Sequence, residues 1–178
     1  METERPSIID PACIFAWDLP VIVLADNMRS FVPWIIRAHT EGNYSHIMEL
    51  FEPGVVATQQ HMFKKAAIDY YMKPYYRLKF WKVTNLPDAD RARWKAMIAG
   101  DLADPWYKKI YDYLGVLTQY INIPSINSEM NKYCSERVGC HLKALGFNVK
   151  DHPSPAELNV YFKEHPERFE LLGYWLAD

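Results

Sequence analysis

Residues 44–60 read YSHIMELFEPGVVATQQ, in which two apolar runs flank a Pro53-Gly54 pair. Proline fixes its own φ and glycine tolerates a positive φ, so this pair is typical of a tight turn. The stretch therefore predicts a β-hairpin, with His46 at the start of its first strand and the polar residues 58–60 at the end of its second. A lone histidine there more often has a structural role, but its ring is free to leave the core and act as a base.

The rest of the chain divides into an early strand-rich part and a later helical part. Apolar and alternating runs predict further strands at residues 14–18, 20–26 and 76–83. Helical spacing and capping residues predict helices at residues 26–40, 87–102, 104–117, 134–147 and 154–166. This order predicts an α+β fold in which a small antiparallel sheet packs against helices. No linker or repeat divides residues 1–178, so we expect a single domain.

The composition excludes several classes of protein. Apolar residues make up 49% of the chain and aromatic residues 15%, which is typical of a folded core and not of disorder. A net charge of -2 with mixed signs gives no basic patch for nucleic acid. No apolar run reaches the roughly 20 residues of a transmembrane segment. The first residues, METERPSIIDPAC, do not have the pattern of a secretory signal, so we expect a cytoplasmic protein; a phage product released by lysis would also fit.

The chain has three cysteines, too few for a disulfide framework. Cys134 stands where the helix of CSERVGCHLKAL begins, and the N–H groups of a helix start favour a thiolate. We therefore expect the pKa of this thiol to lie below its ordinary value of about 8.5. Cys13, in a predicted strand, and Cys140, inside the helix, are expected to be small core residues. Taken alone, Cys134 would also be a core residue more often than a nucleophile.

The order of two motifs changes that balance. IIRAHTEGNYSHIMEL precedes YCSERV, and about 88 residues separate His46 from Cys134. This arrangement resembles the circularly permuted branch of the NlpC-type papain-like cysteine hydrolases, in which a strand carrying Ser-His comes before a Cys-Ser-Glu helix start. A Tyr111-Asp112 pair in the helix before the cysteine matches the same family. The resemblance implies a circularly permuted papain-like fold over roughly residues 10–147.

The resemblance also implies roles for individual residues. Cys134 corresponds to the nucleophile and His46 to the general base that activates it. The third polar residue of such enzymes lies on the strand after the histidine, which makes Gln59 the first choice, with Thr58 and Gln60 behind it. A neutral glutamine would orient the imidazole but would stabilise an imidazolium less than a carboxylate does.

Residues around the thiol are expected to support it. The main-chain N–H of Cys134 would bind the oxyanion, with Tyr111 as a second donor. Ser135 and Glu136 match the family motif and are expected to cap and charge the helix start. Arg137 departs from the leucine that the family often has, and it is expected to face solvent.

Three functions fit these residues. The first is a cysteine hydrolase that cleaves an amide bond, in a peptide or a peptidoglycan cross-bridge, through a thioester intermediate. The second is a non-catalytic binding module on the same fold, which the neutral Gln59 keeps open. The third is a lipid acyltransferase or lipase that uses Cys134 and an apolar groove. Fold does not choose among these substrates.

Other features are expected to carry no chemistry. We expect no cofactor, no metal and no nucleic-acid partner, and the oligomeric state stays open. The aromatic stretch of residues 69–81, which could form a carbohydrate or lipid platform, is expected to be a half-buried edge strand with packed rings. Five histidines do not have the spacing of metal ligands with cysteine or aspartate: His39, His61, His141, His152 and His165.

Overall fold

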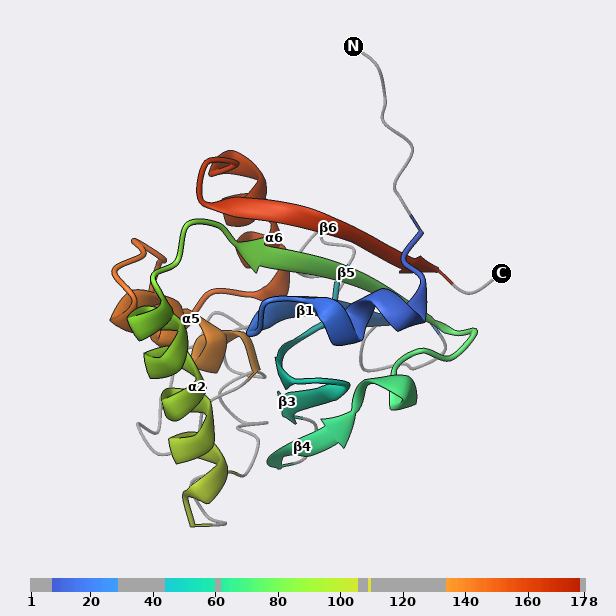
Figure 1. Cartoon of the computed structure of the whole chain (residues 1–178), viewed down its shortest axis with the longest axis horizontal. Helices are drawn as coiled ribbons and strands as arrows, with labels where there is room; N and C mark the ends of the chain where they lie inside the picture. Colours follow the sequence, from blue (N-terminus) through green and yellow to red (C-terminus); the bar gives the residue numbers. More distant parts are fainter. Residues whose placement is uncertain (1–7, 29–43, 60–61, 106–108, 110–133, 177–178) are drawn as a thin grey trace, which may run out of the picture.

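The computed structural model describes residues 8–28, 44–59, 62–105, 109 and 134–176. Its elements, shown in Figure 1, are η1 (Pro11–Ala16), β1 (Val21–Asn27), β2 (His46–Glu52), β3 (Val55–Gln59), β4 (Phe63–Ala67), η2 (Ile68–Tyr70), β5 (Tyr76–Val83), α2 (Asp88–Ala103), α5 (Cys134–Ala144), α6 (Pro155–Glu164) and β6 (Phe169–Leu176). The helices predicted at residues 26–40 and 104–117 fall almost wholly outside the described residues.

The strands form one six-stranded antiparallel sheet in the order β4-β3-β2-β1-β5-β6. The predicted α+β class is therefore confirmed. The sheet is wider than expected, because β4 and β6 were not predicted from the sequence. Strand β5 lies between β1 and β6, so the prediction that residues 69–81 form an edge strand is wrong.

The predicted hairpin is present, and Gly54 makes its turn. Strand β2 ends at Glu52 and strand β3 begins at Val55. Gly54 has φ 71°, a value that residues with a side chain rarely adopt. A Cβ at this glycine would also lie 2.7 Å from the Phe15 ring. Both the turn and the packing of η1 therefore require glycine here.

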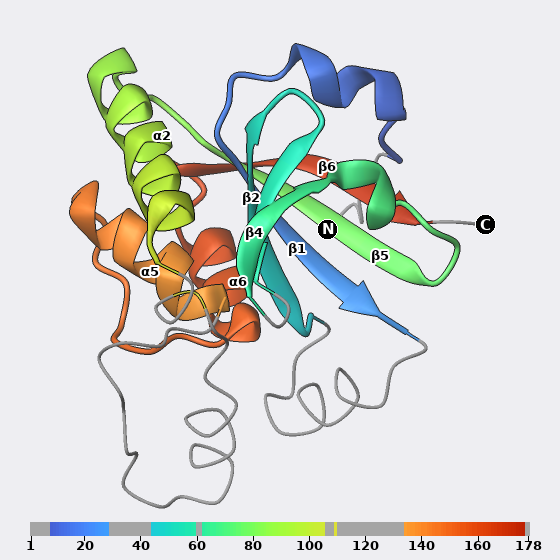
Figure 2. The same cartoon turned by 90° about the horizontal axis from the view of Figure 1, so that it is seen from below.

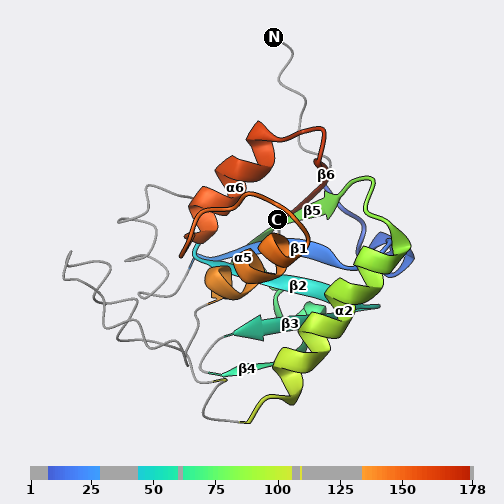
Figure 3. The same ribbon diagram turned by 90° about the vertical axis from the view of Figure 1, so that its left-hand side faces the viewer.

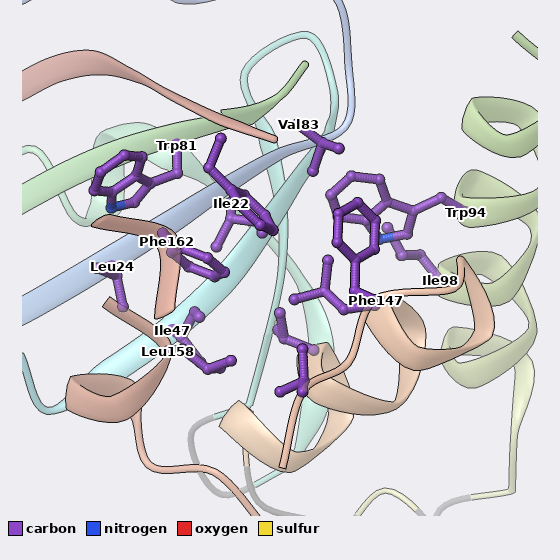
Figure 4. Packing of buried hydrophobic residues seen from close by; sticks show 14 of the residues in the cluster. Ile22, Leu24, Ile47, Trp81, Val83, Trp94, Ile98, Phe147, Leu158 and Phe162 are labelled. Carbon is purple, nitrogen blue, oxygen red and sulfur yellow. The ribbon is translucent and has the colours of Figure 1, made fainter. Parts of the chain in front are cut away.

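The two faces of the sheet carry separate cores. Ile22, Leu24 and Ile47 point to the face that α2, α5 and α6 cover, together with Trp81, Trp94 and Phe162 (Figure 4). The alternate residues Val23 and Met48 point to the other face, where Ile14 of η1 packs. Figures 2 and 3 show the three helices gathered on one side of the sheet. Alternation thus divides the residues of β1 and of the start of β2 between the helix face and the opposite face.

Local signals decide where the helices begin. Ser154 and Glu157 form a capping box at the start of α6, as the sequence predicts. Residues 14–18 do not form the predicted strand, because Pro11–Ala16 is a 3-10 helix capped by the Asp10 side chain. Cys13 is therefore exposed on η1 and is not a core residue.

Candidate functional site

Cys134 is the first residue of α5, as the sequence predicts. It is 5% exposed, and helix α5 contacts strand β2. Three main-chain N–H groups face the thiol, those of Ile47, Ser135 and Cys134 itself. The thiol therefore lies against the main chain of β2 immediately after His46.

His46 is half-buried at the first position of β2. Its Nε2 lies 2.8 Å from the Thr58 Oγ1, and that oxygen lies 2.8 Å from the Tyr71 hydroxyl. The Tyr71 ring also stacks on the imidazole, with 6.2 Å between ring centroids. Thr58 is fully buried and Tyr71 nearly so. The three side chains form one chain of hydrogen bonds that holds the ring.

The prediction that Gln59 orients His46 is wrong, by one residue of strand register. Successive side chains of a strand point to opposite faces, so Thr58 and Gln59 cannot both reach the imidazole. Gln59 points to the helix face, where its Oε1 accepts from Arg137 Nε at 3.2 Å and its Nε2 donates to the Lys109 carbonyl at 3.3 Å. Gln60 lies outside the described residues.

Cys134 and His46 approach the same end of β2 from different sides. The Ile47 side chain belongs to the helix-face core that includes Cys134, whereas the His46 ring contacts Thr58 and Tyr71. Within the described part of the chain, the thiol and the imidazole make no direct hydrogen bond. The two groups are therefore neighbours along β2, joined by the main chain between His46 and Ile47.

The electrostatics of the pair differ from the sequence expectation. Burial raises the pKa of the Cys134 thiol to about 11 and outweighs the three N–H groups, which lower it. Burial also lowers the pKa of His46 to about 4. The prediction of a depressed thiol pKa is therefore wrong, because desolvation exceeds the effect of the helix start. Near neutral pH the site holds a neutral thiol and a neutral imidazole.

A second buried cluster lies on the face of the sheet that the helices cover, farther along α5 than Cys134. The His141 Nδ1 of α5 lies 2.8 Å from the Glu49 Oε1 of β2, and the Trp94 Nε1 of α2 donates to the same oxygen at 2.6 Å. The other nitrogen of His141 lies 3.3 Å from the Asp101 Oδ2. Asp101 also accepts from Arg137 Nη1 at 2.6 Å. The cluster joins α2, α5 and β2.

Each charged group of this cluster favours the charged form of its neighbours. Burial alone would lower the pKa of His141, but the carboxylates of Glu49 and Asp101 raise it to about 10. Burial alone would raise the pKa of Asp101, but the contacts with His141 and Arg137 lower it to about 2. Arg137 is 4% exposed and lies over the Phe63 ring, so the prediction that it faces solvent is wrong.

The sequence contained one signal for this cluster that spacing rules do not use. Glu49 stands between Ile47 and Phe51 in the strand HIMELF, on the same side as both. A carboxylate in such a buried position needs a charged or hydrogen-bonded partner. The partner, His141, follows Cys134 by seven residues, which is two turns of helix.

The predictions for the supporting residues Tyr111, Ser135 and Glu136 have different outcomes. Tyr111 lies outside the described residues. Ser135 is fully buried and its hydroxyl has no hydrogen-bond partner among the described residues, so the prediction that its side chain caps the helix is wrong. Its main-chain N–H still faces the thiol. The Oε1 of Glu136 lies 2.8 Å from the Nδ1 of His152.

Comparisons with known proteins add a fold relative. No family model matches the chain, and no curated protein matches it either. A crystal structure of the metalloprotein yiiX from Escherichia coli O157:H7 is similar in fold, with a TM-score of 0.56 and 17% sequence identity. The match covers 89% of this chain and 87% of that chain. Within the described ranges, no helix is long and apolar enough to cross a membrane.

Proposed function

We propose that the chain is a thiol hydrolase that cleaves an amide bond, in a peptide or peptidoglycan substrate, on a circularly permuted papain-like domain. One observation carries the proposal. The Cys134 thiol, at the start of α5, lies against the main chain of β2 next to His46, and Thr58 and Tyr71 hold the His46 ring. A nucleophile, a base and a residue that orients the base are the parts that such a reaction needs.

The reaction would start from the neutral pair. With Nε2–H donating to Thr58, the Nδ1 of His46 is the nitrogen that would take up the thiol proton. In the described part of the structure the two groups make no direct hydrogen bond, so the proposed transfer would run through one water. The sulfur then attacks the substrate carbonyl, the imidazolium returns the proton to the leaving amine, and a thioester remains on Cys134. Water, deprotonated by the same imidazole, hydrolyses the thioester and restores the thiol. The N–H groups of Cys134 and Ser135 are candidate donors to the oxyanion.

The second candidate is a binding module on the same fold, without turnover. Two observations favour this second candidate. The raised pKa of Cys134, to about 11, leaves the thiolate poorly stabilised, and the neutral hydroxyl of Thr58 leaves the imidazolium of His46 without an opposing charge. A carboxylate in the place of Thr58 would oppose the charge directly.

A metal-dependent reaction fits the described residues poorly. The similar structure of yiiX is titled a metalloprotein. In this chain the two ring nitrogens of His141 lie 2.8 Å from Glu49 and 3.3 Å from Asp101, so direct contacts occupy the sites that a metal would need. No cluster of three or more potential ligands occurs among the described residues.

Intact-mass spectrometry with an activated acyl ester tests the hydrolase proposal. Wild-type protein is expected to gain one acyl group on Cys134 and then to lose it with time, whereas Cys134→Ser should gain none at that position. Acylation of Cys13 or Cys140 alone, with Cys134 unmodified, would reject the hydrolase and favour the binding module. Peptides and peptidoglycan fragments then identify the scissile bond.

A further inference from the structure

We infer that the buried Glu49–His141 pair is a positioning device, which holds helix α5 on strand β2 so that the Cys134 thiol meets the N–H of Ile47. This inference rests on the proposed function, since it assigns these residues to the placement of the proposed nucleophile. Neither residue touches the thiol or the His46 ring in the contacts described above. They would act through the two elements that carry those groups.

Two contacts join the same helix to the same strand. The first is the thiol of Cys134 against the N–H of Ile47, and the second is His141 against Glu49 at 2.8 Å. Cys134 and His141 lie seven residues apart, so they share one face of α5 about two turns apart. Ile47 and Glu49 lie two residues apart, so they share one face of β2. These two polar contacts lie about two helical turns apart, so together they oppose both sliding of α5 along β2 and pivoting of α5 on it.

The pair is fixed in turn from both sides. The Trp94 indole of α2 donates to the Oε1 of Glu49 at 2.6 Å, and the Asp101 carboxylate of α2 lies 3.3 Å from the other nitrogen of His141. Both ring nitrogens of His141 therefore have partners, so the ring cannot turn without breaking a contact. Figure 4 shows the Trp94 ring beside Phe147 and Ile98 in the same core.

The alignment of these contacts matters to the thiol because reacting groups lose rate steeply when they are displaced. A shift of about 1 Å can lower a rate by about a hundredfold. A shift of α5 by one residue would move Cys134 by about 1.5 Å along the helix axis. It would also leave the buried charges of Glu49 and His141 apart. A shift of α5 that displaced the Cys134 sulfur would therefore also break the Glu49–His141 contact, so this contact resists the displacement.

Alkylation of the intact protein with iodoacetamide, mapped by peptide mass spectrometry, tests the inference. The labelling rate of Cys140, on the same helix, shows whether α5 has loosened. The labelling rate of the exposed Cys13 shows whether the reagent is equally active in each sample. His141→Ala is expected to lower the ratio of Cys134 to Cys140 labelling by about tenfold. Glu49→Gln keeps an acceptor for the Trp94 and His141 N–H groups, so its ratio should stay within about threefold of wild type.

Val138→Ala is the matched control, because Val138 lies on the same helix, is 2% exposed and is outside the ion pair. A merely structural role predicts that the labelling ratio falls equally in Val138→Ala and His141→Ala, which would overturn the inference. Rates that rise together at Cys134 and Cys140 in His141→Ala would overturn it as well, because loosening exposes both thiols.

Hydrogen exchange at the Ile47 amide gives the same comparison without thiol chemistry. Faster exchange in His141→Ala than in Val138→Ala supports the positioning role, and equal exchange contradicts it. Failure of the acyl-ester experiment counts against the hydrolase alone, since the amide comparison still decides the positioning role.

Discussion

At the scale of single residues, burial decides the state of the candidate nucleophile. The N–H groups around the Cys134 sulfur favour a thiolate, but the loss of water around the thiol opposes it more strongly. The same loss lowers the pKa of the His46 imidazole. In the proposed reaction, proton transfer would therefore accompany attack on the substrate, since no thiolate–imidazolium pair is stored in advance.

Titration of Cys134 checks this state. In a Cys13→Ala/Cys140→Ala background, the ultraviolet absorbance of the thiolate should rise with a midpoint near pH 11, because burial raises the pKa of this thiol to about 11. A midpoint below about 8.5, the ordinary thiol value, would mean that the helix start and the imidazole outweigh burial. The Cys134→Ser variant of the same background gives the baseline.

Thr58 and Gln59 provide a second comparison between neighbouring residues. Thr58→Val removes the hydroxyl that holds the His46 ring and should lower the rate of thioester formation by roughly 10–10³-fold, the scale of one positioning contact. Gln59→Ala loses its bonds to Arg137 and Lys109 and should destabilise the fold by about 1–2 kcal/mol, with little effect on the rate once folded. A larger loss of rate with Gln59→Ala would return Gln59 to the third position.

At the scale of elements, the ion pair between α5 and β2 makes stability depend on pH. The pKa of folded His141 is raised to about 10, above the ordinary value of about 6.5 in an unfolded chain. The stabilisation by protonated His141 is therefore complete below about pH 6.5 and is lost as the pH rises through about 10. Near pH 6, the free energy of unfolding of wild type should exceed that of His141→Gln by about 3–5 kcal/mol, the scale of a broken buried ion pair.

Urea unfolding of both proteins between pH 6 and pH 10 measures this difference. The gap between wild type and His141→Gln should shrink as the pH rises. Lys143→Gln, on the exposed side of the same helix, should show a small gap of about 1 kcal/mol or less. A His141→Gln gap that is constant with pH would show that His141 is neutral in the folded protein.

The elements differ in how far the sequence could predict them. The hairpin and the start of α6 follow from local signals, a Pro-Gly turn and a capping box. The register of β3 does not, because Val55, Val56 and Ala57 are all apolar and leave the phase of Thr58 and Gln59 open. Strand β6 pairs with β5, about 90 residues earlier in the chain, so this pairing has no local signal.

At the scale of the whole molecule, the site depends on contacts between distant segments. Arg137 looks like a surface residue in the sequence, yet it lies between Gln59 of β3 and Asp101 of α2. His141 likewise finds its partners on β2 and α2. The partners of such charged residues cannot be predicted from spacing along one helix, because the packing of distant elements against each other determines them.

The central claim is that Cys134 is a nucleophile activated by His46, and the rate of Cys134 acylation in His46→Ala tests it most directly. An activated ester is mixed with wild type, His46→Ala and Thr58→Val, and acylation of Cys134 is followed by mass spectrometry near neutral pH. The account predicts a loss of about 10²–10⁴-fold in His46→Ala, the usual contribution of a general base, and a smaller loss in Thr58→Val. Equal acylation rates in wild type and His46→Ala, with both proteins folded, would contradict it.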